Sequence, residues 1–495
     1  MLADTILRPL TAWSPSAEAA VRVGYGLLLT LQLLMTVRQA KRFFVSETYG
    51  GYMESSPLRD LVLRPAVAHV LMGVWVAAAI GIMTNTWLLV ATAVHFVLAR
   101  YFFVKTRWAS ILRGMGAPGH MNHWIGAFMF LLALSHVIDD HGLLRGVTVL
   151  TFRIDFAAMM LMAGIYKLTA GYAHGDGFER GLVNPWWGFW ARPLQRAPAH
   201  SVVFRFFNHS AWLAEVICPA LWLFPPAAPY AAAFFAASFL GIAVSIRLTF
   251  LAEMVALCCV MYVYPGTAPD TLLSSWLPVA APAPTAGPLT TVIVYPLVAL
   301  MGVFLVALPV AYAGMSINFY RKTRLPHVLQ TALDRWSRFF GLILWRVFTA
   351  DVINFYARIV LRGPDATTGE EYLLMKPWDG RSQWRYMHVG EFICLASIFT
   401  TLKYYPTNRA LFDTRIVRYA RTLPIPRGGD VVFEYHSVLK GRERFEFPQV
   451  ARFTVNPMTS TVSEEVVDAA VDVRAPARIS PVAPGEVPGS YAPAR

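Results

Sequence analysis

The run Met162-Ala163-Gly164-Ile165-Tyr166-Lys167-Leu168 closes a hydrophobic segment that begins near Ile154. An apolar segment of about 20 residues is long enough to cross a bilayer as a helix. This one ends in an amine, and an ionisable group inside a membrane span is costly and is by default a functional-site hypothesis. Removal from water disfavours the charged form of an amine, and only a neutral amine can take a proton from a substrate. A lysine near a helix end can also extend to the lipid headgroups, so position alone leaves both interpretations of Lys167 open.

The rest of the chain has the same hydrophobic character. Of its 495 residues, 56% are hydrophobic and only 15% are charged. This composition predicts an all-α polytopic membrane protein with a small mixed, β-containing appendage at its C-terminal end. Nine stretches are apolar enough to suggest spans, several of them short, so we expect about nine transmembrane helices. They are residues 18–36, 66–83, 86–104, 122–138, 153–170, 210–227, 229–248, 249–264 and 289–315.

The basic residues indicate topology. The formal net charge is +13, but the basic side chains lie between hydrophobic spans and not in a basic soluble domain, so they do not predict nucleic-acid binding. We expect them to contact anionic lipids of the bilayer. The loops that contain Lys41 and Lys105 would share one face with Lys167, and the positive-inside rule makes that face cytoplasmic. The sequence thus predicts a multi-pass protein of the cell (inner) membrane.

The chain divides into a membrane body, a membrane-proximal appendage and a tail. Their expected ranges are residues 1–320, 321–456 and 457–495. Leu333 to Leu361 interleaves apolar and arginine side chains, which is typical of a basic amphipathic helix in the membrane interface. The tail is rich in proline and poor in aromatic residues, and is predicted to be disordered.

Alternating residues in the appendage predict strands. Val431, Phe433 and Tyr435 alternate toward a turn near Gly441, and residues 444–447 continue beyond it. This pattern predicts a β-hairpin over residues 431–447. Ala451 to Val455 would add a third strand.

The candidate site combines three segments in sequence order. Asn122 and His123 open one span, Lys167 closes the next, and Trp186-Trp187-Gly188-Phe189-Trp190 follows in the connection. Consecutive antiparallel helices place the start of one and the end of the next on the same membrane face, so His123 and Lys167 can line one cavity. Alternatives remain open, because a histidine at a helix start, tryptophans at the headgroup level and a glycine such as Gly164 are common in membrane proteins.

Other polar residues suggest weaker hypotheses. Glu215 is the best candidate partner for Arg247, either as a structural ion pair or beside a site for an acidic substrate. Asp139-Asp140-His141 has metal-ligand residue types, but three consecutive helical residues cannot all face one ion, so no metal site is predicted. The four cysteines, Cys218, Cys258, Cys259 and Cys394, are expected to be small core residues and not a redox centre.

These motifs resemble the vitamin K-dependent gamma-glutamyl carboxylase family and its bacterial horizontally transferred transmembrane domain relatives, over roughly residues 18–265. The resemblance lies in Asn122-His123, in the Ala-Gly-x-x-Lys-Leu run that ends at Leu168, and in the tryptophan-bearing loop. It implies that the amine of Lys167 deprotonates a reduced vitamin K or menaquinone-type quinol. Oxygen then adds, the resulting base removes a glutamate gamma proton, and carbon dioxide traps the carbanion.

The residue types and the resemblance together predict a set of site residues. Lys167, His123 and Asn122 would be catalytic, and Gly164, Trp186, Trp187 and Arg247 would bind substrate, which is a lipophilic quinol together with a peptide or small molecule. This chain departs from the family in two respects. The second histidine that the carboxylases carry in a later span is not evident near residues 239–243, and the large substrate-gripping domain is missing.

A different class of protein is the alternative. The same fold would then belong to a non-catalytic membrane transporter or an assembly or maturation factor, in which Lys167 only pairs with a carboxylate such as Asp155. A β-rich C-terminal part also resembles the lipase maturation factors, with the hairpin at residues 431–447 as the supporting feature.

Overall fold

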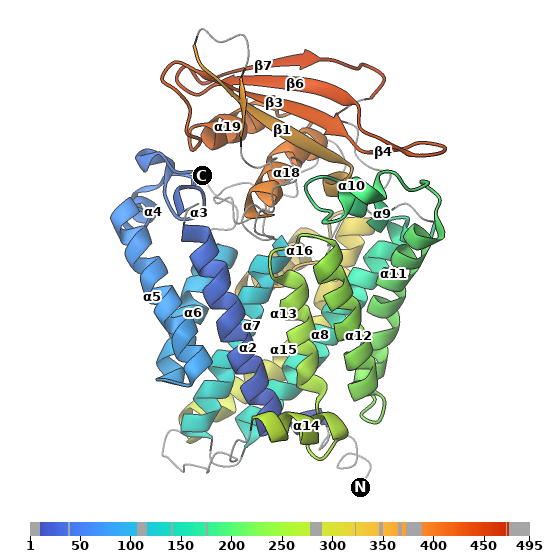
Figure 1. The fold of residues 1–495 in the computed structure, drawn as a ribbon. Helices are drawn as coiled ribbons and strands as arrows, with labels where there is room; N and C mark the ends of the chain where they lie inside the picture. Colours follow the sequence, from blue (N-terminus) through green and yellow to red (C-terminus); the bar gives the residue numbers. More distant parts are fainter. Residues whose placement is uncertain are drawn as a thin grey trace.

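The structure is a computed structural model of the 495-residue chain. Helices form one block, and a sheet with two helices covers one end of it (Figure 1). The described residues are 10–37, 40–105, 116–139, 142–174, 177–277, 290–321, 323–345, 350–364, 369–372, 389–471 and 473–474.

The block is a bundle of long helices joined by short helical segments. The long helices are α2 (Pro15–Thr36), α5 (Pro65–Thr84), α6 (Leu88–Ala99), α7 (Gly116–Ile138), α8 (Leu143–Thr169), α11 (Val202–Trp222), α12 (Ala228–Ser245) and α15 (Tyr295–Tyr320). The shorter ones are α3 (Ala40–Phe43), α4 (Pro57–Val62), α9 (Phe178–Val183), α10 (Ala191–Leu194), α13 (Leu251–Cys258) and α14 (Ala268–Trp276). A π-helical turn, Arg100–Lys105, extends α6.

Seven helices of the described chain are long and apolar enough to cross a membrane. They are Pro15–Thr36, Pro65–Thr84, Leu88–Lys105, Pro118–Ile138, Leu143–Thr169, Ala228–Ser245 and Val292–Tyr320. The expectation of nine fails at two segments. Helix α11 has the length but carries Arg205, Asn208 and Glu215, which lower its hydropathy. Leu251–Tyr262 is a shorter apolar helix of 12 residues, or about 18 Å, well under the ~30 Å hydrocarbon thickness.

Local sequence sets where the helices begin and end. The Ser14 hydroxyl accepts a hydrogen bond from the Ala17 N–H at 3.2 Å, and Pro15 follows at the first helical position of α2. Asn85, with φ of 61°, ends α5 in the left-handed conformation that closes many helices. These stops make successive helices reverse direction.

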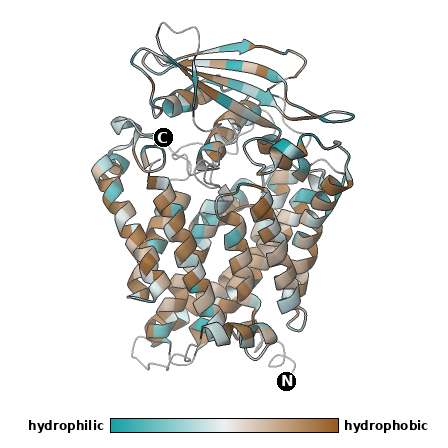
Figure 2. Cartoon of the chain, in the orientation of Figure 1, coloured by the Kyte–Doolittle hydropathy of each residue, from teal (hydrophilic) through white to brown (hydrophobic). Residues whose placement is uncertain are grey.

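The reversals bring several helix ends together. The C-terminal ends of α2, of the turn after α6 and of α8 lie at the end of the bundle that the sheet covers (Figure 1). Lys41 in α3 and Lys105 at the end of the π-helical turn therefore lie at the same end as Lys167, the arrangement expected from the basic residues. Apolar residues predominate along the helices, whereas hydrophilic residues recur along the strands (Figure 2).

The C-terminal appendage is a five-stranded antiparallel sheet in the order β2-β1-β3-β6-β7. Its strands are β1 (Phe355–Arg362), β2 (Glu370–Glu371), β3 (Asp430–Ser437), β6 (Gln449–Asn456) and β7 (Thr461–Val466), and its helices are α16 (His327–Phe340), α17 (Ala350–Ile353), α18 (Val389–Tyr404) and α19 (Arg409–Ala420). Phe399 of α18 contacts the rings of Phe355, Phe433 and Phe453, so α18 covers the inner face of the sheet.

The predicted amphipathic helix over residues 333–361 is too long. Helix α16 ends at Phe340, because Gly341 takes φ of 77° and breaks the helical hydrogen-bond pattern. Residues 355–362 instead form β1, which pairs with β3 along its whole length. The apolar and arginine residues that suggested one helical face thus alternate across a strand at the C-terminal end of this segment.

The hairpin and tail predictions need correction as well. Strand β3 pairs with β1 and β6, whereas residues 444–447 supply only β5 (Phe445–Glu446), which pairs with β4 (Leu439–Lys440). The third strand expected at residues 451–455 is present as part of β6. The prediction that the tail is disordered from residue 457 is wrong for β7, because Thr461–Val466 completes the edge of the sheet through backbone pairing with β6. Residues 475–495 lie outside the described chain.

Polar contacts join the appendage to the bundle. The Asn184 side chain donates hydrogen bonds to the carbonyls of Ile353 and Phe355 at 2.9 and 2.8 Å. Glu179 of α9 pairs with Lys440 at 3.0 Å, and Arg42 of α3 pairs with Glu391 of α18. The sheet is therefore held against the end of the bundle where Lys167 lies.

Candidate functional site

Lys167 forms a buried ion pair within the bundle. It lies in the last turn of α8, only 2% exposed, and its Nζ pairs with Glu215 Oε1 of α11. Both side chains are 3% exposed. The second carboxylate oxygen, Glu215 Oε2, is buried without a hydrogen-bond partner in the described residues. The amine therefore points into the protein and does not extend to the headgroups.

A glycine allows the two helices that carry this pair to approach closely. Gly164 lies one turn before Lys167, and a Cβ at this position would come within 2.8 Å of the carbonyl carbon of Glu215 and of Val216 Cγ2. Only a residue without a side chain leaves this space to α11. Gly164, predicted to bind substrate, is here covered by α11, and its role in the described fold is to bring Glu215 to Lys167.

An aromatic ring also lies near the amine. Tyr172, in a 3-10 turn (Tyr172–His174) just after α8, places its ring centroid 6.0 Å from Lys167 Nζ. This distance is at the limit of a cation–π contact. Lys167 thus has a buried carboxylate and a buried aromatic ring as neighbours.

Two predicted ion pairs are wrong. Asp155 does not pair with Lys167, because it lies 12 residues earlier in the same helix, about 18 Å away; its Oδ2 accepts a hydrogen bond from Trp124 Nε1 at 2.9 Å. Arg247 does not pair with Glu215. Its guanidinium donates to the Pro185 carbonyl at 3.1 Å and lies 5.1 Å from the Phe189 ring centroid. Residue spacing along the chain does not show which helix faces meet, and here α8 and α11 meet at Gly164.

Asn122 belongs to a separate buried network that links α7 to α2. Its amide nitrogen donates to Gln32 Oε1 at 3.0 Å and to the Pro118 carbonyl at 2.9 Å. Its side-chain oxygen accepts a hydrogen bond from the Tyr25 hydroxyl at 3.0 Å. The amide is well satisfied, so Asn122 positions these helices against one another.

His95 is a member of this network that sequence reasoning missed. Trp75 donates its indole N–H to His95 Nδ1 at 2.8 Å. Because an indole nitrogen is only a donor, Nδ1 is the acceptor, and the proton of the neutral ring is on Nε2. Nε2 lies 2.7 Å from the Tyr25 hydroxyl and 3.1 Å from the Asn122 carbonyl. A histidine in the interior of a predicted span was the available signal.

His123 has neighbours different from those of Lys167. Its ring stacks on Phe96 with a centroid distance of 5.6 Å, and its Nε2 lies 3.5 Å from an Arg100 guanidinium nitrogen. A Cβ at Gly341 would come within 2.9 Å of the ring, so the turn after α16 closes over it. A cavity shared by His123 and Lys167 stays a prediction.

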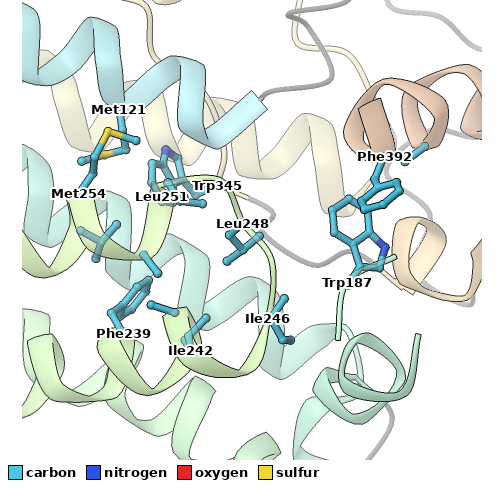
Figure 3. Close-up of a cluster of buried hydrophobic side chains, with 14 of the residues drawn as sticks. Met121, Trp187, Phe239, Ile242, Ile246, Leu248, Leu251, Met254, Trp345 and Phe392 are labelled. Carbon is cyan, nitrogen blue, oxygen red and sulfur yellow. The ribbon is translucent and has the colours of Figure 1, made fainter. Parts of the chain in front are cut away.

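The predicted substrate-binding tryptophans lie beneath the appendage. Trp186 and Trp187 are 0% and 2% exposed, and both rings contact Phe392 of α18, at centroid distances of 5.5 and 6.4 Å. The Trp187 ring lies beside that of Phe392 in Figure 3. They are therefore core residues between bundle and appendage and not part of an aromatic belt. Trp190, by contrast, is exposed as a belt residue would be.

The described residues contain no group of three or more histidine, cysteine or acidic side chains that could hold a metal ion. Asp139 instead accepts hydrogen bonds from the backbone N–H groups of Leu143 and Arg145, both at 3.1 Å. Asp140 and His141 lie outside the described residues. All four cysteines are free and buried.

No protein-family model, curated protein or solved structure matches this chain. The class of protein therefore follows from the fold. Seven helices that are long and apolar enough to cross a bilayer, followed by a small antiparallel sheet, define a multi-pass membrane protein.

Proposed function

We propose that the protein is an integral enzyme of the inner membrane that performs acid–base chemistry on a lipophilic substrate of the reduced-quinone type. Lys167 and Glu215 are its proton-handling residues. The observation that carries the proposal is their buried ion pair, in which Glu215 Oε2 has no hydrogen-bond partner in the described residues.

Energetics favour a functional role for this pair. Replacing a buried ion pair by apolar residues of similar volume is often neutral or stabilising, so such a pair is weak support for stability alone. In a membrane span the ionisable groups that are present mark binding sites and proton pathways. The pair also requires Gly164, which costs helix propensity relative to alanine.

The pair can hold or move one proton. Glu215 Oε2 can accept a proton from a hydroxyl group, while the Lys167 ammonium stabilises the negative charge that forms beside it. If the ammonium proton first moves to Glu215, the neutral amine of Lys167 accepts the proton instead. A reduced quinone would supply such a hydroxyl, and exclusion of water by Tyr172 and α11 strengthens the electrostatic effect.

The sequence resemblance to the vitamin K-dependent carboxylases supports the same assignment, with Lys167 as general base and carboxylation as the reaction it implies. Asn122 and His123 would act by position, because Asn122 holds α7 against α2 and His123 packs between Phe96 and the turn at Gly341.

Quinol-dependent oxygen uptake by the purified full chain in lipid nanodiscs tests the proposal. Lys167→Ala and Glu215→Gln should each abolish uptake, and Lys167→Arg should fail too, because a guanidinium stays protonated. The matched control is Lys440→Ala, which removes another lysine–glutamate pair, with Glu179, and should retain activity. Oxygen uptake by Lys167→Ala at the wild-type rate would disprove the role of Lys167.

One observation favours a second candidate, a non-catalytic transporter or assembly factor. Lys167 does pair with a carboxylate, as that alternative requires, although the carboxylate is Glu215 and not Asp155. If the pair only holds α8 to α11, the double variant Lys167→Met with Glu215→Leu should be as stable as wild type. The double variant should then also retain the function of the protein in the cell. The enzyme proposal predicts instead that the double variant is folded but inactive.

A further inference from the structure

Asp155 is a buried carboxyl group in the middle of the membrane body. It lies 12 residues, or about 18 Å, into the 27-residue helix α8. Trp124 of α7 donates to its Oδ2 at 2.9 Å, and the Tyr312 hydroxyl of α15 interacts with the same carboxyl group. Its Oδ1 is buried without a hydrogen-bond partner in the described chain. Neutral groups thus hydrogen-bond to the carboxyl group, whereas its Oδ1 has no hydrogen-bond donor in the described chain.

A second unpartnered oxygen lies on the same face of α8. Thr151 is four residues before Asp155, and its buried Oγ1 also has no partner in the described part of the chain. Side chains four residues apart on a helix are neighbours, with Cβ atoms about 5–6 Å apart. Thr151 Oγ1 and Asp155 Oδ1 therefore form a pair of adjacent acceptor atoms at mid-membrane depth.

Helix α15 packs alongside this part of α8. Thr148 contacts Met301 and Ser316 contacts Met162, both with oxygen–sulfur distances of 3.7 Å, so α15 runs alongside α8 in the same direction. Tyr312, whose hydroxyl interacts with the Asp155 carboxyl group, comes from this helix.

Side-chain cations near Asp155 are directed elsewhere. Arg153 donates to the carbonyls of Met261 and Leu10 at 2.8 and 2.7 Å, and Lys167 pairs with Glu215. On α7, His123 lies against Phe96 and Arg100, and His136 pairs with Glu18 at 2.6 Å. The helix α15 has no charged residue between Tyr295 and Tyr320. None of these groups neutralises an Asp155 carboxylate by an ion pair in the described structure.

We propose that Asp155 Oδ1 and Thr151 Oγ1 bind one exchangeable monovalent cation, either a proton or Na⁺. A bare carboxylate in a low-dielectric interior is too costly to persist, so a positive charge must accompany it. One carboxylate with a neutral oxygen neutralises a single charge, whereas Ca²⁺ and Mg²⁺ sites use more ligands or retained waters. An exchangeable charge at mid-membrane depth is the arrangement through which ion gradients act on membrane proteins. This site is independent of the chemistry proposed for Lys167.

The Na⁺ arm of the test is the melting temperature of the purified full chain in NaCl and in choline chloride at equal ionic strength. If Na⁺ is the ligand, NaCl should raise the melting temperature with a saturable dependence, and Asp155→Asn should abolish the increase. Thr151→Val keeps the carboxyl group and should weaken the apparent Na⁺ affinity about tenfold, the loss of one ligand worth roughly 1.4 kcal/mol. Thr148→Val, one turn away on the same face, is the control and should keep the wild-type response.

The proton arm is infrared difference spectroscopy. If the ligand is a proton, the protein should show a carboxylic-acid C=O band that disappears as pH rises from about 5 to about 9. Asp155→Asn should lack the band, and Thr151→Val should shift its midpoint. Because Asp155→Asn can impair folding, the Thr151→Val response is the second measurement that keeps the test decisive. A wild-type protein with neither a saturable Na⁺ effect nor a titrating band sensitive to both substitutions would overturn the proposal.

Discussion

The backbone of Glu215 lies against Gly164, where an added Cβ would come within 2.8 Å of the Glu215 carbonyl carbon. This contact sets the distance between α8 and α11 one turn before the Lys167–Glu215 ion pair. The geometry of the pair therefore depends on a residue that has no polar group of its own.

Gly164→Ala should destabilise the protein because the new Cβ must displace the α11 backbone. Overpacking of this kind typically costs about 1–3 kcal/mol, which we expect as a lower melting temperature. The control is Gly302→Ala in α15, where no atom lies within 4 Å of the added Cβ. Alanine there should be neutral or stabilising by roughly 0.5–1 kcal/mol. Equal melting temperatures for the two variants would contradict the close packing of α8 and α11.

Trp75→Phe should leave His95 Nδ1 as a buried acceptor without a donor. Such a group costs about 1–3 kcal/mol in addition to the lost aromatic surface. Trp222→Phe is a matched comparison, because Trp222 is as buried as Trp75 but its indole N–H has no hydrogen-bond partner in the described residues. We expect the larger loss of thermal stability for Trp75→Phe. The assigned tautomer would be wrong if nitrogen NMR showed His95 Nδ1 protonated near neutral pH.

The buried Lys403 should make the free energy of unfolding depend on pH in the alkaline range. It is buried in the appendage, beside Asn354 and the Asp351 carbonyl, and burial lowers its pKa from 10.5 to about 8. Burial of the charged amine lowers the free energy of unfolding. This penalty is fully present below about pH 8, where Lys403 is protonated in both the folded and the unfolded state. It is relieved as pH rises toward 10.5, by roughly 3 kcal/mol at 1.36 kcal/mol per pKa unit.

The measurement for Lys403 is melting temperature against pH for wild type and for Lys403→Met. Many other lysines and tyrosines titrate in the same range, so the difference between the two proteins is the informative quantity. Wild type should gain stability relative to Lys403→Met between about pH 8 and about pH 10.5. Parallel curves would show that burial does not perturb this amine.

Truncation should distinguish β7 from the residues that follow it. Ending the chain after residue 474 removes a segment with a disorder-prone composition, and should leave thermal stability unchanged. Ending it after Asn456 removes β7 and exposes the backbone edge of β6, so we expect a lower melting temperature and aggregation. Removal of Glu464 and Glu465 adds to the loss of thermal stability, since they pair with Arg409 and Arg452. Indifference to the longer deletion would mean that β7 adds nothing to the sheet.

Several features of this protein follow from its sequence alone. The membrane class follows because hydropathy is a local property that can be summed over a window of about 20 residues. The buried, unbridged cysteines and the strand at residues 451–455 follow from local composition and alternation in the same way. The shared end of α3, which holds Lys41, and of the π-helical turn that ends at Lys105 follows from basic residues that recur between successive spans.

Only the tertiary structure decided which polar groups meet. Glu215 is 48 residues from Lys167, and Gln32 is 90 residues from Asn122. Asp155, the partner suggested for Lys167 by residue type, lies 12 residues before it in the same helix, about 18 Å away, so the partner comes from another helix. The choice depends on which helix faces pack together, and a steric detail, the missing side chain at Gly164, brings α11 to Lys167. The edge strand β7 could not be predicted from the sequence for a similar reason. Its order comes from pairing with β6 and not from the composition of its own residues.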